Sequence, residues 1–156
     1  MNTLQIGDFV PDFTAKDQNE NPINLSDYKG KKLIFFFYPK ASTPGCTAEA
    51  CSLRDGYQAL RKLGYELLGV SADNAKKQLG FAQKNDLPFR LIADEDHTVL
   101  TIFGVWGPKK FMGREYDGIH RMTFVLNEEH QITHRIDKVK TKEHTAQLLE
   151  LLQQEM

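Results

Sequence analysis

The sequence contains little cysteine and no long hydrophobic run. Only Cys46 and Cys51 occur among its 156 residues. Two cysteines exclude the disulfide-dense scaffolds of small secreted proteins, and a chain of this length can bury a core without such bridges. No segment approaches the ~18 consecutive apolar residues that a transmembrane helix requires, so no membrane span is expected.

Neither sign of charge is in excess. Lysine and arginine number 20 and aspartate and glutamate 21, for a formal net charge of −1. This balance gives no electrostatic reason to expect nucleic acid or an anionic membrane as a partner. The first ten residues lack the basic and apolar stretches of a signal peptide. A cytoplasmic location is therefore expected, where a permanent structural disulfide is not. Near-neutral charge and few exposed apolar positions favour a monomer.

The chain also lacks internal repeats, low-complexity tracts and a Pro/Gly/Ser-rich linker, which predicts one domain over residues 1–156. Within it, strand patterns alternate with helical ones. We expect a hairpin within 12–25, a helical turn at 26–28, strands at 33–38, 65–70, 89–93, 122–126 and 131–136, and helices at 46–63, 75–85, 94–103 and 141–153. Asp73 and Thr141 are expected helix caps, Gly64 is an expected helix stop, and 104–113 is expected to be an irregular loop. The order predicts an α/β fold with a mixed central β-sheet flanked by helices, after an N-terminal β-hairpin.

Ligands of such sheets bind beyond the carboxyl ends of the strands, and the loop after 33–38 contains Cys46. Cys46 lies in the first turn of a predicted helix, where unpaired backbone N–H groups favour thiolate over thiol. Gly45 lets the backbone approach a ligand closely, and the hydroxyl of Thr43 can donate or accept a hydrogen bond. A buried, inert cysteine is the commoner fate of this residue type, but the position favours a nucleophile.

Cys51 follows Cys46 by five residues. In one α-helix these residues differ by ~140° in direction, and their Cα atoms are roughly 8–9 Å apart. A disulfide needs less than ~7 Å and converging Cβ vectors. The pair is therefore either two unrelated thiols or a redox switch whose closure unwinds the start of the helix.

Residues 38–51 read YPKASTPGCTAEAC. This segment resembles the active site of peroxiredoxins, and more narrowly that of the bacterioferritin comigratory protein or peroxiredoxin Q subfamily, with two cysteines in one chain. Pro39, Thr43 and Cys46 match the pattern of Pro, three residues, Thr, two residues, Cys. Residues 94–107 and 113–124, which contain Arg121, resemble the subfamily too, and the similarity covers nearly the whole chain.

The resemblance implies a thioredoxin-like fold and a thiol-dependent peroxidase that reduces hydrogen peroxide and organic hydroperoxides in antioxidant defence. By this analogy the Cys46 thiolate attacks the peroxide and becomes a sulfenic acid. Cys51 resolves the sulfenic acid as an intramolecular disulfide, which thioredoxin or glutaredoxin then reduces. Thr43, with the backbone N–H groups of Gly45 and Cys46, holds the peroxide. Arg121 stabilises the thiolate and the leaving oxyanion.

Two supporting roles are also implied. Pro39 shields the site and sets the angle of the loop, although it also simply ends a strand. Glu49 orients an arginine by family analogy, although an acid in the first turn of a helix is favourable in itself. Trp106 is expected to pack beside the moving helix. His120 and the pair Lys109–Lys110 are expected at the surface.

Two other functions stay open. One is a dithiol–disulfide oxidoreductase acting on proteins, which the absence of a C-x-x-C motif disfavours. The other is a metal-binding module of Cys46, Cys51 and a histidine, for which the two cysteines face different directions on a helix. The sequence contains no nucleotide-binding loop, so no cofactor and no metal is expected, and sulfur alone can carry the redox chemistry.

Overall fold

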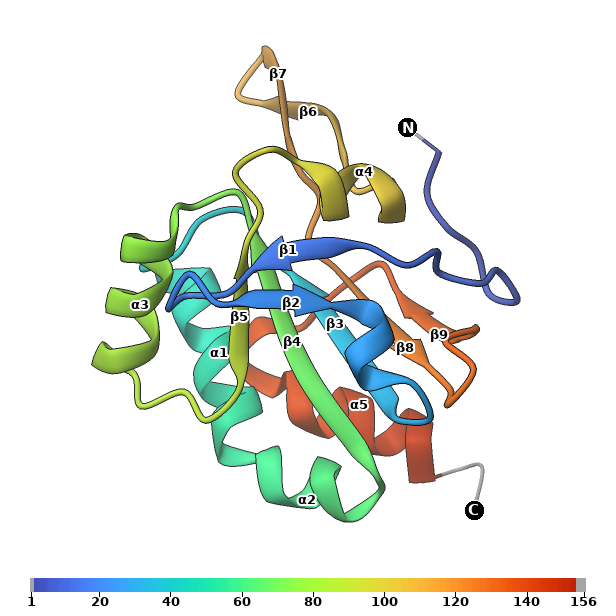
Figure 1. Ribbon diagram of the computed structural model, residues 1–156. Helices are drawn as coiled ribbons and strands as arrows, with labels where there is room; N and C mark the ends of the chain where they lie inside the picture. The colour runs from blue at the N-terminus through green and yellow to red at the C-terminus, as the bar shows by residue number, and fades with distance from the viewer. Residues whose placement is uncertain (1, 154–156) are drawn as a thin grey trace.

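A five-stranded mixed β-sheet runs through the centre of the protein (Figure 1). The structure is a computed structural model and describes residues 2–153. The strand order is β5-β4-β3-β8-β9. Strands β3, β4 and β5 run parallel to one another, and β8 pairs antiparallel with β3 on one side and with β9 on the other. The strands are β3 (Lys32–Phe37), β4 (Tyr65–Ser71), β5 (Arg90–Ala93), β8 (Met122–Leu126) and β9 (Ile132–Ile136). The predicted mixed α/β fold is confirmed.

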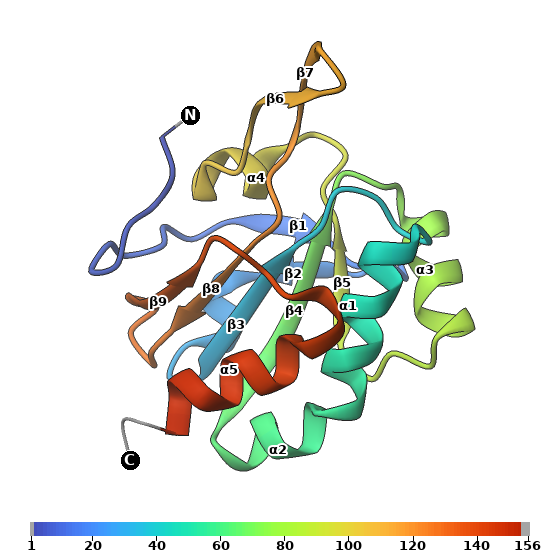
Figure 2. The same cartoon turned by 180° about the vertical axis from the view of Figure 1, so that it is seen from behind.

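Helices cover both faces of the sheet (Figures 1 and 2). One face carries α1 (Pro44–Asp55), α2 (Tyr57–Lys62) and α5 (His144–Gln153), with α3 (Ala75–Lys84) beside β5. The other carries α4 (Thr98–Phe103), the hairpin of β1 (Thr14–Lys16) and β2 (Pro22–Asn24), and the 3₁₀ turn Leu25–Tyr28. The predicted N-terminal hairpin and helical turn are thus both present.

The central strand β3 is buried on both sides, as its unbroken apolar run predicts. Phe35 and Phe37 point into the cluster beneath α4 and the hairpin, and Ile34 and Phe36 into the cluster beneath α1 and α5. Each such buried side chain contributes about 1.5–3 kcal/mol. This strand anchors the loop that leads directly to Cys46.

The helix predicted over 46–63 differs in two ways. It begins at Pro44, because proline at the first helical position has no N–H to leave unpaired. It is also interrupted at Gly56, which separates α1 from α2. A Cβ at Gly56 would lie 2.0 Å from Cγ2 of Thr145, so glycine here allows α5 to pack closely against the break. Gly64, with a φ of 93°, follows the end of α2 as predicted.

The loop predicted over 104–113 is wrong, because β6 (Trp106–Phe111) pairs there with β7 (Arg114–Ile119). This hairpin projects away from the sheet (Figures 1 and 2). Its turn uses positive φ angles at Met112 and Gly113, as two-residue hairpin turns require. Most of its side chains are solvent-exposed, so no apolar alternation marked it as a strand pair.

Three predicted helix starts are also corrected. Asn74, not Asp73, caps α3, and its side chain accepts from the N–H of Lys77. The helix expected from residue 94 begins at Thr98, because the preceding residues form a turn held by the carboxylate of Asp94. Thr141 opens the 3₁₀ turn Thr141–Glu143, and α5 starts only after it.

Candidate functional site

The first turn of α1 places Cys46 just beyond the carboxyl end of β3. Thr43 precedes the helix, and its carbonyl accepts the first helical bond, from the N–H of Thr47, at 2.8 Å. Cys46 is the third helical residue, so neither its N–H nor that of Gly45 has an acceptor within the helix. The Cys46 side chain is 2% exposed and packs in the cluster beneath α1. Cys46 thus lies in the first turn of a helix beside unpaired N–H groups, as the sequence predicts, and its sulfur is also buried.

The loop between β3 and α1 is held in shape by polar contacts. The Thr43 hydroxyl donates to the carbonyl of Lys40 at 2.7 Å and does not cap the helix. Asp73 accepts from the N–H of Ala41 at 2.7 Å, which ties the loop to the end of β4. Ser42 adopts a φ of 66°, a left-handed conformation that these contacts stabilise. Pro39 is half-buried at the start of the loop, where the strand ends as predicted.

Arg121 joins Cys46 to Glu49. The antiparallel pairing of β8 with β3 brings the residue before β8 to the carboxyl end of β3. Nη2 of Arg121 lies 3.2 Å from Sγ of Cys46, and Nη1 lies 2.6 Å from Oε1 of Glu49. The approach is close, since a Cβ at Gly45 would lie 3.3 Å from Nη2. The predicted arginine beside the nucleophile and the predicted Glu49–arginine pair are both present in the structure.

Glu49 is a fully buried carboxyl group on α1, one turn beyond Cys46. Burial raises its pKa to about 7, an effect that the nearby charge of Arg121 and its hydrogen bond only partly offset. Burial acts to lower the pKa of Arg121, but the negative charges of Glu49 and Cys46 outweigh this and leave it raised. One guanidinium therefore faces two groups that can each carry a negative charge.

Sequence reasoning missed His144, the first residue of α5. Its ring is fully buried, with Nε2 3.6 Å from Oε2 of Glu49 and 2.7 Å from Oγ1 of Thr123. The only sequence signal is a histidine on the apolar face of an amphipathic helix, and such a residue is usually core.

Sequence reasoning also misplaced Lys109. It is half-buried and not a solvated residue, and Nζ donates to the carbonyl of Ile119 at 2.8 Å. Burial and the positive charge of Arg121 lower its pKa, and the negative charge of Cys46 opposes them. Arg121 and Lys109 both line a cavity of about 330 Å³, which His120 also borders.

Cys51 lies in the same intact helix as Cys46, and both are free thiols. Its half-buried Sγ is 3.7 Å from Oδ1 of Asn85 on the neighbouring segment. Helical geometry keeps the two cysteines too far apart to bond. Ser52, the next residue, makes two hydrogen bonds with Thr145. The Ser52 carbonyl accepts from the Thr145 hydroxyl at 2.6 Å, and the Ser52 hydroxyl accepts from the Thr145 N–H at 3.1 Å.

Trp106 does not pack beside α1, which corrects the sequence prediction. It contacts the hydrophobic cluster on the opposite face of the sheet, and its ring centroid is 4.2 Å from that of His97. The cause is the β6–β7 hairpin, which begins at the end of α4. Tryptophan fluorescence is therefore no direct probe of the first turn of α1.

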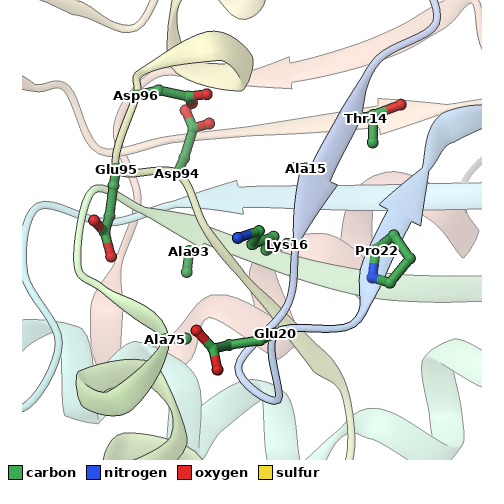
Figure 3. A pocket seen from close by; sticks show the side chains of 10 residues that line it. All are labelled: Thr14, Ala15, Lys16, Glu20, Pro22, Ala75, Ala93, Asp94, Glu95 and Asp96. Atoms are coloured by element: carbon green, nitrogen blue, oxygen red, sulfur yellow. The ribbon is translucent and has the colours of Figure 1, made fainter.

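A separate cavity of about 510 Å³ lies between the β1–β2 hairpin and the carboxyl end of β5 (Figure 3). Its side chains are mainly short or acidic, and neither cysteine lines it. Asp94, at its edge, already accepts from the N–H groups of Val99 and Leu100. Among residues 2–153, no group of three or more His, Cys, Asp or Glu side chains could hold a metal, and no helix is long and apolar enough to cross a membrane.

A parallel-core α/β sheet with a cysteine at a helix N-terminus, held against an arginine, defines a thiol-based redox enzyme of the thioredoxin-like class. Comparison with known proteins narrows this class. Residues 6–135 match the AhpC/TSA family, and the chain belongs to that family. It is a thiol-dependent peroxidase, a peroxiredoxin.

Relatives resemble the chain along its whole length. It is 46% identical over 154 residues to peroxiredoxin Bcp of Escherichia coli, covering 99% of both chains. It is 42% identical over 150 residues to peroxiredoxin Bcp of Bacillus subtilis, covering 96% of both. Among solved structures, peroxiredoxin Q of Xanthomonas campestris matches with a TM-score of 0.85 and 32% identity, over 91% of this chain and 90% of that one. A Xylella fastidiosa PrxQ variant matches with a TM-score of 0.92 and 27% identity, over 99% of both.

Proposed function

We propose that Cys46 is the peroxidatic residue and that its thiolate reduces hydrogen peroxide and organic hydroperoxides. The observation that carries this assignment is the 3.2 Å contact between Nη2 of Arg121 and Sγ of Cys46, at a helix N-terminus. A cation and unpaired N–H groups both favour thiolate, which is the reactive form of cysteine. A trapped ligand complex of the Xanthomonas campestris bacterioferritin comigratory protein is described in terms of alkyl peroxide reduction, which supports organic hydroperoxides as substrates here.

In the first step the thiolate sulfur attacks the terminal oxygen of the peroxide, and the O–O bond breaks. Cys46 is oxidised to sulfenic acid, and the leaving alkoxide or hydroxide takes a proton to become alcohol or water. In this proposal the N–H groups of Gly45 and Cys46 and the hydroxyl oxygen of Thr43 hold the peroxide. The guanidinium of Arg121 stabilises the charge that develops on the leaving oxygen.

In the second step Cys51 attacks the sulfenic sulfur, which releases water and forms a Cys46–Cys51 disulfide. The first turns of α1 must unwind for this, because both cysteines lie in one helix. A dithiol reductant then transfers two electrons and two protons to restore both thiols. We propose thioredoxin or glutaredoxin for this role, in the cytoplasm, where the cysteines stay reduced between turnovers and the enzyme serves antioxidant defence.

We also propose that the protein acts as a monomer. The balanced charge and a core that takes up most large apolar side chains support this state. Sedimentation of the reduced protein should give the mass of one chain over a wide concentration range, and a concentration-independent dimer would contradict it.

The assignment is tested by steady-state peroxide consumption with thioredoxin as donor. Cys46→Ser should abolish turnover. Cys51→Ser should consume about one equivalent of peroxide per chain and then stop, because the sulfenic acid has no resolving thiol. Normal turnover in Cys46→Ser would falsify the assignment. Insulin reduction without peroxide consumption would instead favour a protein dithiol oxidoreductase.

A further inference from the structure

We propose that His144 is a positioning residue for the Cys46 reaction. His144 and Glu49 together hold one proton, which neutralises the Glu49 carboxyl group. The positive charge of Arg121 then acts on Cys46 alone. The inference rests on the proposed role of Cys46. It concerns a histidine on α5 that touches neither sulfur nor peroxide and acts through Glu49 and Arg121.

The hydrogen bonds around His144 fix which ring nitrogen carries a proton. Gln147 donates through its Nε2 to the carbonyl of Lys138, and its Oε1 accepts from the N–H of Lys140. Oε1 is therefore the oxygen, and Nδ1 of His144, 3.0 Å away, must donate to it. In the neutral ring Nε2 is then bare and accepts from the hydroxyl of Thr123 at 2.7 Å.

The two carboxylate oxygens of Glu49 differ in their surroundings. Oε1 accepts from Arg121, whereas Oε2 is buried and makes no hydrogen bond with any of residues 2–153. Nε2 of His144 lies 3.6 Å from this oxygen. With Glu49 ionised and His144 neutral, the unpaired Oε2 faces a ring nitrogen that already accepts from Thr123 and has no proton to donate, which is unfavourable in a dry interior. A proton bound to Oε2 removes the buried negative charge that this arrangement leaves without a donor.

The proton resides mainly on Glu49. Burial raises the pKa of Glu49 to about 7, while burial lowers that of His144 to about 4, with the positive charge of Arg121 acting in the same direction. At mildly acidic pH, therefore, the Glu49 carboxyl group is protonated and the His144 ring is neutral.

The other elements around the cluster add few charges. Arg121 precedes β8 and faces both anionic groups, and Lys109 on β6 interacts with Arg121 and Cys46. Tyr38 at the end of β3 interacts with Cys46, but burial raises its pKa well above its usual value, so it stays neutral. Ionisation of Glu49 is therefore the change that redirects Arg121 away from Cys46. We expect peroxide reactivity to fall as pH rises through about 7.

Glu49→Gln imitates the protonated carboxyl group, since it carries no charge and its amide oxygen can accept from Arg121. This variant should lose the fall near pH 7 and exceed the wild type at pH 8–9 on the order of tenfold, the effect of one competing charge within hydrogen-bonding distance. His144→Gln places a permanent N–H donor beside Oε2 and keeps Glu49 ionised. It should react more slowly than the wild type at pH 6, again on the order of tenfold, and show no step near 7.

The measurement is the second-order rate constant for Cys46 oxidation by hydrogen peroxide, by stopped flow from pH 5 to 9. Infrared spectra of the reduced protein give a readout independent of turnover: a protonated carboxyl band should be present at pH 6, decline through pH 7, and be missing from both variants. His130→Gln is the matched control. His130 lies in the β8–β9 turn at the far end of β8, where its ring contacts the carbonyl of Tyr28. It should keep the wild-type profile and the band.

The idea is overturned if the infrared band is missing from the wild type or persists in His144→Gln. It is equally overturned if Glu49→Gln keeps the fall near pH 7 or loses reactivity at every pH, which would show that Arg121 needs an ionised partner. Failure of the proposed function looks different, because the wild type itself would then leave peroxide unreduced.

Discussion

Arg121 carries one positive charge and contacts two acidic groups, the Cys46 thiol and the Glu49 carboxyl group. At the residue scale the chemistry depends on how that charge is divided. A guanidinium suits this position because it has several donors in a rigid plane and stays protonated when partly buried.

Arg121→Gln should slow Cys46 oxidation by on the order of 10²–10³-fold, the usual cost of losing one electrostatic donor at a reacting centre. The reason is the loss of both thiolate stabilisation and a donor to the leaving oxygen. Stopped-flow reaction with hydrogen peroxide measures this. Arg61→Gln is the control, since it removes an exposed arginine that pairs with Glu66, and its rate should match the wild type. Equal rates in the two variants would remove Arg121 from the mechanism.

The proton held by Glu49 and His144 also predicts how the free energy of unfolding depends on pH. Between about pH 4.5 and 6.5 the folded protein holds a proton on Glu49, and the unfolded chain holds one on His144, so the pair contributes no slope. In Glu49→Gln the folded state holds none, because the pKa of His144 remains low. Its free energy of unfolding should therefore fall relative to the wild type by about 1.4 kcal/mol per unit as pH drops from 6.5 towards 4.

Urea unfolding of both proteins across this range, compared at each pH, checks this prediction. Taking the difference removes the contribution of all other titrating groups. A difference that stays constant with pH would show that Glu49 binds its proton equally in the folded and unfolded states, which contradicts the raised pKa.

At the scale of elements, the two halves of α1 differ in how they are held. The first turns carry Cys46 and Cys51, whereas Ser52, which follows them, is hydrogen-bonded to Thr145 of α5. The disulfide therefore has to unwind residues up to Cys51 while α5 holds the remainder of the helix.

Amide hydrogen exchange should show this division. On forming the Cys46–Cys51 disulfide, the N–H groups of residues 47–51 should lose protection, because their helical acceptors lie in the turns that unwind. The N–H of Gly56, which donates to the carbonyl of Ser52, and that of Leu60, which donates to the carbonyl of Gly56, should keep most of theirs. Cys51→Ser oxidised to the sulfenic acid is the control and should keep protection throughout. Full protection of residues 47–51 in the disulfide form would refute local unwinding.

The elements that the sequence predicted correctly are those whose residues meet the core. β3 and β4 are almost wholly apolar, and the inward positions of α1 and α2 recur with helical spacing. The β6–β7 hairpin was missed because it stands away from the core and no face of it is apolar. The starts of helices were misplaced where a side chain before the helix accepts hydrogen bonds from its first N–H groups, as Asp94 does for α4.

At the scale of the whole molecule, the sheet assembles the site from distant parts of the chain. The pairing of Met122 with Phe37 sets Arg121 beside Cys46, which is 75 residues earlier. The local motif around Cys46 was readable from sequence because its function depends on neighbouring residues. His144 was not, because its partners come from α1 and β8 and only the folded packing reveals them.

The tight packing of the sheet predicts a clear contrast between two glycines. A Cβ at Gly69 on β4 would lie 2.6 Å from Phe36 and 2.7 Å from Leu91, whereas a Cβ at Gly80 on α3 would meet no atom of the described part of the chain within 4 Å. Gly69→Ala should lower the free energy of unfolding by about 1–3 kcal/mol through overpacking. Gly80→Ala should raise it by about 0.5–1 kcal/mol, because alanine loses less entropy in a helix. Chemical denaturation measures both, and equal effects would contradict the packing described.

In the proposed mechanism one helix supplies both the peroxidatic and the resolving thiol. Mass mapping of the reduced protein after one equivalent of hydrogen peroxide tests this most directly. We expect a single product that has lost two hydrogens, with Cys46 and Cys51 joined within one chain and no thiol left to titrate. A stable sulfenic acid in the wild type, a disulfide between two chains, or oxidation at Cys51 with Cys46 still free would contradict it.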